Sequence, residues 1–201
     1  MALTDIYRKA FEDDCIELIT SAYLIALSEK KYQLIWLEND FSELLGRYVN
    51  NNPLSVAKGI TCETEKKLLS ETVIMAKGFA DKLPRIDFVY SKIWKKERVH
   101  CYMEAKRLKE SDSQLKRAYI DEGMDRFISG KYPMGCMLGY LLEGKTNATI
   151  NGINSLLTKD KRNTETLQPK QTKLFKSYYE SIHSTTGILK HLVFDFANTA
   201  N

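Results

Sequence analysis

Three residues in the middle of the chain, Asp87, Glu104 and Lys106, are of types that support metal-assisted chemistry. Glu104 and Lys106 lie in the segment VHCYMEAK, 99–106, which has the composition of a strand, so alternation places both side chains on one face. Asp87 interrupts a second strand-like segment, IDFVYSKI, 86–93, and a hairpin would bring it beside Glu104. Two adjacent carboxylates repel each other unless a cation lies between them, and oxygen ligands suit Mg²⁺.

The elements around these residues follow from hydrophobic periodicity. The charged sequence WKKER has the length of a hairpin connection between the two segments. After the hairpin, apolar spacing predicts a helix over 111–129, with Ser111 or Asp112 as its N-cap, and then a buried strand over 134–142. The remaining elements are a helix over 147–157, a basic loop over 159–176, and a closing hairpin of strands near 177–183 and 188–196.

The N-terminal part reads differently, because two apolar stripes at helical spacing cover residues 5–49. Asn and Pro at 50–55 are expected to end this helical part, and 56–83 is compatible with a helix or with a strand-and-helix mixture. We therefore expect an α/β fold, a mixed sheet flanked by helices, in a single domain of 201 residues. Its parts are N-terminal helices (1–50), a core (about 56–158), the basic loop (159–176) and closing strands (177–201).

The motif residues resemble the PD-(D/E)XK nuclease superfamily, whose fold is that of restriction endonucleases. Pro84-Arg85-Ile86-Asp87 stands where that family has its PD half, with two residues inserted between Pro and Asp. Glu104-Ala105-Lys106 matches the ExK half residue for residue. The order of elements is also similar to the family's core, so that the resemblance spans about residues 34–158.

The resemblance implies a Mg²⁺-dependent nuclease, with Mn²⁺ as a possible substitute. Asp87, Glu104 and the carbonyl of Ala105 would hold the metal, and Lys106 would act on the attacking water. The family often has a further Glu on the helix before the sheet. We favour Glu38 over Glu43 for this role, because Glu38 shares the apolar stripe of Phe41 and Leu45. Gln114 and Tyr119 resemble a Gln and Tyr pair of the RecB-like branch, with a spacing that differs by one.

The charge distribution favours a polyanionic partner. Residues 1–91 carry a net charge of -3 and residues 92–201 a net charge of +7. The expected phosphate contacts are Lys92, Lys95, Lys96, Arg98, Arg107 and Lys109, with Gln114 and the 159–176 loop. The expected partner is nucleic acid, more readily DNA than RNA, in restriction, repair or defence against foreign DNA. No sequence-reading module is visible, so a homodimer or a partner protein could supply target recognition.

The same residues also allow simpler structural interpretations. A Glu-x-Lys on a strand is often a surface salt bridge, an Asp in a strand is often an edge residue, and the domain could be an inactive nucleic-acid-binding scaffold or a regulatory subunit. His100, His183 and His191 lack metal-ligand spacing and are expected to be structural, the last two pairing across the closing hairpin. No Gly-rich phosphate loop, apolar membrane run or leader is visible. Four dispersed Cys favour the reducing cytoplasm, so we expect a cytoplasmic protein.

Overall fold

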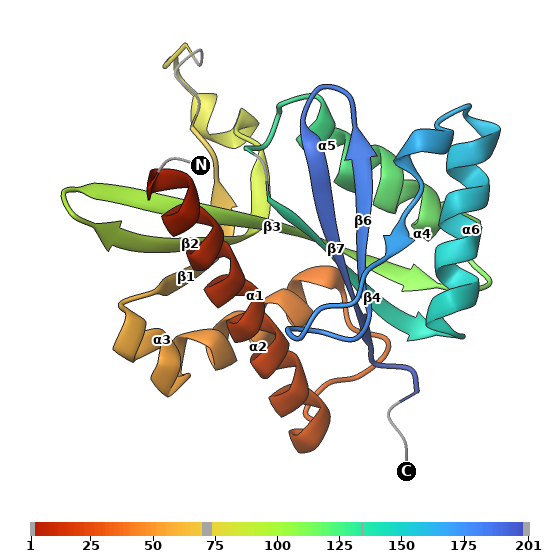
Figure 1. Cartoon of the computed structure of the whole chain (residues 1–201), viewed down its shortest axis with the longest axis horizontal. Helices are drawn as coiled ribbons and strands as arrows, with labels where there is room; N and C mark the ends of the chain where they lie inside the picture. Colours follow the sequence, from red (N-terminus) through yellow and green to blue (C-terminus); the bar gives the residue numbers. More distant parts are fainter. Residues whose placement is uncertain (1–2, 70–73, 134, 199–201) are drawn as a thin grey trace.

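The computed structural model describes residues 3–69, 74–133 and 135–198. A mixed sheet crosses the molecule in the order β1-β2-β3-β4-β7-β6-β5 (Figure 1). The central strands β3, β4 and β7 are parallel, and the other neighbouring strands pair antiparallel. In chain order the strands are β1 (Thr61–Lys67), β2 (Arg85–Trp94), β3 (Glu97–Lys109), β4 (Cys136–Glu143), β5 (Gln168–Pro169), β6 (Tyr178–His183) and β7 (Gly187–Asp195).

Helices cover both faces of this sheet (Figure 1). One group packs its apolar residues with Phe88, Met103 and Leu138, and the other packs with Val89, Met137 and Val193. The first group is α1 (Leu3–Glu29), α2 (Glu38–Asn50) and α3 (Pro53–Lys58). On the second face lie α4 (Ser113–Ala118), α5 (Asp125–Ile128) and α6 (Thr146–Lys159), of which α5 and α6 contribute apolar residues to the core. The expected α/β fold, with a mixed sheet flanked by helices and an N-terminal helical part, is confirmed.

The β2–β3 hairpin is the element that the sequence specifies most clearly. β2 ends at Trp94 and β3 begins at Glu97, and the two strands pair from Trp94–Glu97 to Phe88–Met103. Alternation along β3 sends Cys101, Met103 and Ala105 into the core beneath α1 and α2. The side chains of Glu104 and Lys106 therefore leave the strand on the opposite face.

The helix expected over 111–129 is broken into three pieces. Asp112 caps α4 by accepting hydrogen bonds from Gln114 N and Leu115 N at 2.8 and 3.0 Å. A single π-helical turn, Tyr119–Met124, then separates α4 from α5. Gly123 lies in this turn, and a Cβ there would meet Met137 Cε at 2.3 Å. The missing side chain therefore lets the helix approach β4 closely, and π turns often occur at functional sites.

Two further expectations need correction. The Asn-Pro stretch at 50–55 ends α2 but also starts α3, because Asn52 accepts a hydrogen bond from Leu54 N and Pro53 occupies the first turn, where its missing N–H costs nothing. The basic loop expected over 159–176 contains a 3₁₀ turn, Asn163–Glu165, and strand β5. The ambiguous stretch 56–83 holds the end of α3, strand β1 and a 3₁₀ turn, Phe79–Lys82. Residues 70–73 of it, like Met134 of the strand expected from 134, lie outside the described residues.

The closing hairpin is confirmed as β6 and β7, which pair antiparallel from Tyr178–Leu192 to His183–Gly187. Cys15, Cys62, Cys101 and Cys136 are free and buried. Among the described residues, no helix has the length and apolar character needed to cross a membrane.

Candidate functional site

The fold brings together four of the side chains that the sequence singled out. Asp87 lies near the start of β2, one residue before the Phe88–Met103 pair of the hairpin, and Glu104 and Lys106 lie near the end of β3. Glu38 is the first residue of α2, where a carboxylate complements the helix dipole. Strand pairing and the position of α2 therefore place three carboxylates around one ammonium group.

The ammonium group of Lys106 is the centre of this cluster. Its Nζ donates to Glu38 Oε1 at 2.8 Å, to Glu104 Oε1 at 3.0 Å and to the carbonyl oxygen of Ala105 at 2.8 Å. The second oxygen of Glu38, Oε2, accepts from Arg107 N at 3.1 Å. Asp87 Oδ2 accepts from Ala105 N at 2.6 Å, which fixes the Asp87 carboxylate against β3.

Burial governs the electrostatics of the cluster. Glu104 is 2% exposed, Asp87 5% and Lys106 8%. Burial raises the pKa of Asp87 well above its ordinary value, and the Glu104 carboxylate raises it further while Lys106 opposes the shift. Burial also raises the pKa of Glu104, against the influence of Lys106 and Arg126. For Lys106 burial acts to lower the pKa, but the three carboxylates outweigh it and raise the pKa.

One oxygen of the cluster lacks a partner. Glu104 Oε2 is buried and makes no hydrogen bond among the described residues. A buried carboxylate oxygen without a partner carries a desolvation cost that a bound cation would offset. Together with Asp87 and the Ala105 carbonyl it forms a donor set of oxygens alone, which fits Mg²⁺ or Mn²⁺.

These donors do not form a finished metal cage. No group of three His, Cys, Asp or Glu residues converges as a metal site within the described part of the chain. The Lys106 ammonium lies between Glu38 and Glu104, and its hydrogen bonds hold these two carboxylates. The oxygen ligands are therefore of the type that a hard divalent cation prefers. The ammonium group of Lys106 is hydrogen-bonded to two of the same groups, the Glu104 carboxylate and the Ala105 carbonyl.

Two residues of the site were missed by the sequence interpretation. Arg126 of α5 donates to Glu104 Oε1 at 2.8 Å and to the hydroxyl of Tyr132 at 3.0 Å. Tyr132 in turn donates to the carbonyl of Arg85 at the start of β2. Arg126 is one of 30 basic residues, and no local pattern distinguishes it. Only the path of the chain after the π turn brings it to Glu104.

A cleft of about 300 Å³ opens on one side of the cluster. Glu38 and Lys106 line it together with Arg107, Leu115 and Glu122, whereas Asp87 and Glu104 do not reach it. Lys106 therefore stands between this cleft and the two most buried carboxylates. A larger cleft of about 780 Å³, between α1, the first half of β3 and the β6–β7 turn, contains none of the four clustered residues, so we place the site at the smaller one.

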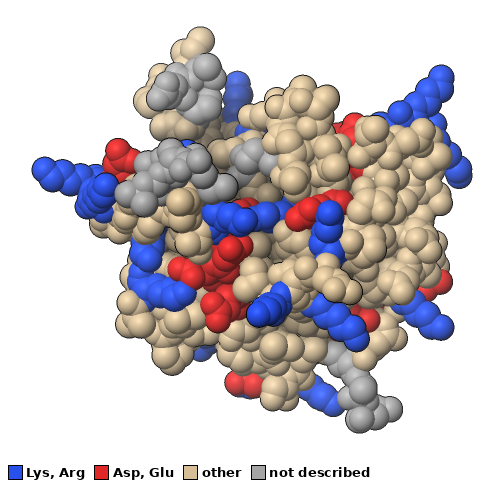
Figure 2. All heavy atoms as spheres, viewed as in Figure 1, with Lys and Arg blue, Asp and Glu red and all other residues tan. Residues whose placement is uncertain are grey.

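The expected nucleic-acid contacts are scattered. Lys92, Lys95, Lys96 and Arg98 lie at the far end of the β2–β3 hairpin, where basic side chains project at the left of Figure 2. Arg98 and Glu104 are six residues apart on β3, about 20 Å along a strand. The hairpin cations lie near aromatic rings: Lys95 Nζ is 4.7 Å from the Trp94 ring centroid, and Trp94 stacks on Tyr7 at 4.1 Å. The face in Figure 2 mixes acidic with basic side chains.

The remaining expected contacts differ in their distance from the cleft. Arg107 lines it and donates to the carbonyl of Trp36 at 3.4 Å. Lys109 lies 3.8 Å from Glu143, and Gln114 is exposed on α4 and does not line the cleft. Of the expected phosphate contacts named individually, Arg107 is therefore the one that the structure brings to the cleft.

The side chains weighed as alternatives lie elsewhere. Glu43 accepts a hydrogen bond from Thr64 Oγ1 at 2.6 Å and is not in the cluster. Tyr119 is fully buried and its hydroxyl lies 2.9 Å from His191 Nδ1, so it does not accompany Gln114 at a site. His100 lies 2.9 Å from Ser91 Oγ.

Comparison with known proteins adds no relative to this description: no protein-family model, curated protein or solved structure matches the chain.

Proposed function

We propose that the chain is a metal-dependent nuclease that hydrolyses phosphodiester bonds, with DNA as its substrate and Mg²⁺ as its ion. The observation that carries the proposal is the unpartnered oxygen Glu104 Oε2, buried beside Asp87 and Lys106. The resemblance of Pro84–Asp87 and Glu104–Lys106 to the PD-(D/E)XK motif supports it, and a restriction-endonuclease-like core is part of the same proposal.

Each residue has a distinct role in this reaction. Asp87, Glu104 and the Ala105 carbonyl would hold the ion, which supplies a Lewis acid for the phosphoryl group and a bound water of lowered pKa. Lys106, with a raised pKa, remains protonated near neutral pH and stabilises the negative charge that develops on the phosphate. Arg107 at the cleft would contact a phosphate.

Substrate binding would extend beyond the cleft. The hairpin residues Lys95, Lys96 and Arg98, about 20 Å away, would contact phosphates further along the same nucleic acid. Because the basic side chains are mixed with acidic ones on the face in Figure 2, we expect modest affinity from one chain alone. A second copy or a partner protein would then supply target recognition, in restriction, repair or defence.

A second candidate function is supported by one observation. Lys106 and Arg126 already compensate two of the charges on Asp87, Glu104 and Glu38 without any metal. A cluster neutralised to this extent is also what a nuclease-like scaffold without activity would need in order to remain folded. Metal-dependent turnover separates the two candidates.

The test is a cleavage assay on plasmid, linear and single-stranded DNA and on RNA, with Mg²⁺, Mn²⁺ or chelator. The parent should cut in either metal, and Asp87→Asn and Glu104→Gln should reduce cleavage to the level seen with chelator. Glu43→Gln is the matched control, because Glu43 lies on the same helix as Glu38 but contacts Thr64 instead of the cluster. Cleavage by Glu104→Gln at the parental rate, or none by the folded parent in either metal, would remove the nuclease proposal.

A further inference from the structure

The hydrogen bonds of Lys106 occupy the oxygens that the proposed function assigns to a metal. Its Nζ lies 3.0 Å from Glu104 Oε1 and 2.8 Å from the Ala105 carbonyl, and both groups belong to the proposed donor set. The third partner, Glu38 Oε1 at 2.8 Å, faces the cleft. An ammonium group has three donors, so all of them are engaged.

Two cations cannot share these oxygens at low cost. Mg²⁺ binds oxygen at about 2.0–2.1 Å in a nearly octahedral shell, which leaves little room for an ammonium group on the same carbonyl and carboxylate. At separations of a few Å the two positive charges would also repel each other strongly, because the surroundings are buried and screening is weak. Metal binding and the present position of Lys106 are therefore alternatives.

The other contacts show which bonds of the cluster persist. Arg126 holds Glu104 Oε1 from α5, so the Glu104 carboxylate keeps its orientation when Lys106 leaves. Glu38 is fixed independently, because its second oxygen accepts from Arg107 N at 3.1 Å. Lys106 can thus lose Glu104 and Ala105 while keeping Glu38, and this shift moves its Nζ toward the cleft.

We infer that Lys106 is the chain's own counter-ion in the cation site, and that metal binding displaces its ammonium group onto Glu38 at the cleft. The inference rests on the proposed function and deepens it. It assigns Glu38 the role of a positioning residue that retains Lys106 next to the incoming phosphate, and no metal contact.

Metal affinity measured without substrate tests this directly. Isothermal titration with Mg²⁺ should give at least about tenfold tighter binding for Lys106→Met than for the parent, equivalent to about 1.4 kcal/mol. Arg107→Met is the matched control for long-range charge, since Arg107 lines the same cleft but donates to none of the proposed metal ligands. It should change affinity by much less. Equal tightening by the two variants, or no tightening by Lys106→Met, overturns the inference while leaving the metal site intact.

A second measurement needs no variant at Lys106 and so does not depend on its folding. In the parent labelled with ¹⁵N-lysine, the Lys106 Nζ resonance should shift on saturation with Mg²⁺, because two of its three hydrogen bonds break. Lys116 is the internal control, a buried lysine whose Nζ donates to the Glu110 carbonyl at 2.6 Å, away from the cluster. An unchanged Lys106 signal in metal-saturated protein overturns the inference. If the folded parent and Lys106→Met both bind no Mg²⁺, the metal site and the proposed function fail together.

Discussion

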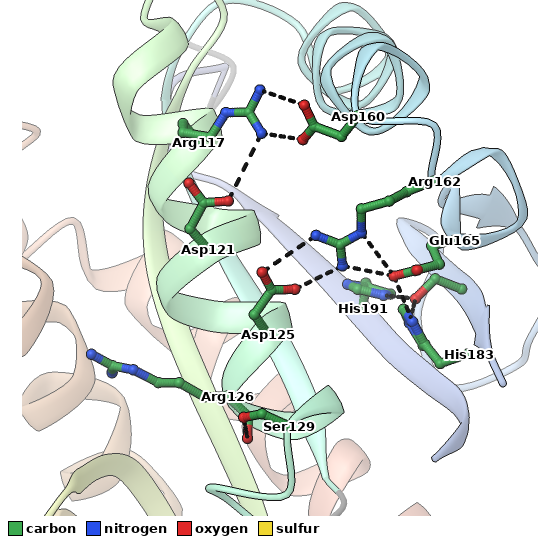
Figure 3. A network of polar contacts seen from close by, with 11 residues as sticks. Arg117, Asp121, Asp125, Arg126, Ser129, Asp160, Arg162, Glu165, His183 and His191 are labelled. Atoms are coloured by element: carbon green, nitrogen blue, oxygen red, sulfur yellow. Dashed lines mark hydrogen bonds and ion pairs between the residues drawn. The ribbon is translucent and has the colours of Figure 1, made fainter. Parts of the chain in front are cut away.

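Two polar networks reach into the core of this molecule, and they differ in whether all of their polar groups have partners. The Lys106 cluster at the end of β3 leaves Glu104 Oε2 without a partner. The second network, in Figure 3, joins the α4–α5 segment to α6 and the closing hairpin. There Arg162 binds Asp125 and Glu165, each at 2.7 Å, and Glu165 lies 2.9 Å from His183 Nδ1.

The second network continues inward as an unbroken chain of hydrogen bonds. His183 Nε2 and His191 Nε2 lie 2.7 and 2.8 Å from Ser181 Oγ, and His191 Nδ1 lies 2.9 Å from Tyr119 Oη. Glu165 accepts, so His183 carries its proton on Nδ1 and its Nε2 accepts from Ser181. His191 Nε2 then donates to Ser181, and Tyr119 donates to His191. Every donor and acceptor of the two rings is used.

The number of unpartnered polar groups indicates which of the two networks is structural and which is a candidate binding site. Glu165, His183 and Ser181 have the order of a Ser-His-Glu triad, but Ser181 is fully buried and no substrate can reach it. We therefore interpret this network as structural, with His183 and His191 linked through Ser181 and not directly. The Lys106 cluster has a vacant acceptor and a neighbouring cleft, which are features of a binding site.

The largest expected effect is on the stability of the complete network. Arg162→Ala removes hydrogen bonds to two carboxylates, Asp125 and Glu165, and should lower the free energy of unfolding by about 2 kcal/mol. Arg117→Ala is the control, because Arg117 pairs with Asp160 at the surface, where the loss should be under about 1 kcal/mol. Urea unfolding measures both. Equal losses would show that the contacts of Arg162 contribute no more than the exposed Arg117–Asp160 pair, which Figure 3 also shows.

A smaller effect is expected at Arg126, which orients Glu104 without belonging to the proposed donor set. Arg126→Gln should weaken Mg²⁺ binding about 10- to 100-fold, because residues that orient metal ligands typically contribute that much. Arg126→Lys should recover part of the affinity, and Arg117→Gln should have no effect. Calorimetric titration of the three variants checks this, and an unaltered affinity in Arg126→Gln would exclude a positioning role.

The pH dependence of stability should have opposite signs in the two regions. Burial lowers the pKa of His191 to about 3, below the ordinary value of about 6.5 expected in the unfolded chain. The unfolded state therefore binds this proton first, and stability is lost as pH falls below about 6.5, by up to roughly 1.4 kcal/mol per pH unit. Asp87 and Glu104 have raised pKa values, so their protonation in the folded state works in the other direction.

Urea unfolding of the parent and His191→Gln between pH 7 and 4.5 separates these contributions. The variant keeps an amide near the position of Nε2 but has no proton to gain. The free energy of unfolding of the variant should therefore decline less steeply with falling pH than that of the parent. The difference in slope should be up to roughly 1.4 kcal/mol per pH unit, the value for one proton. Parallel curves would mean that His191 does not titrate on unfolding.

The smallest expected effect is a gain. Asp87→Asn should stabilise the metal-free protein by about 1 kcal/mol at pH 7, since it removes repulsion from Glu104 while its amide oxygen can still accept from Ala105 N. Asp81→Asn, at an exposed position, is the control and should change nothing. Thermal melts in chelator measure the difference. A lower melting temperature for Asp87→Asn would show that the carboxylate of Asp87 stabilises the fold as a hydrogen-bond acceptor more than its repulsion from Glu104 destabilises it.

Local patterns predicted much of the fold and part of the cluster. Alternation in β2 and β3 is a local property, so the hairpin and the shared face of Glu104 and Lys106 could be read from the residues. Glu38 was placed by its spacing from Phe41 and Leu45 on the same helix, and the structure brings it within 2.8 Å of Lys106 Nζ. These inferences needed only neighbours in sequence.

The missed features depend on contacts between distant segments. Arg126 reaches Glu104 because Gly123 and the π turn redirect the helix, and neither has a strong signal in one sequence. The hydrogen-bonded chain from Glu165 to Tyr119 joins the π turn to the 3₁₀ turn Asn163–Glu165 and to β6 and β7, which are far apart from the π turn in sequence. The distance of the basic hairpin from the cluster could not be predicted either, because Arg98 is close to Glu104 in sequence but lies about 20 Å away along the extended strand.

Crystals of the protein grown or soaked with Mn²⁺ test the central claim most directly. The account predicts an anomalous difference peak between the carboxylates of Asp87 and Glu104, with Lys106 Nζ withdrawn from Glu104 and still bound to Glu38. A map with no peak at Asp87 and Glu104 in Mn²⁺-saturated crystals, and with Lys106 still bonded to Glu104 and Ala105, would contradict it.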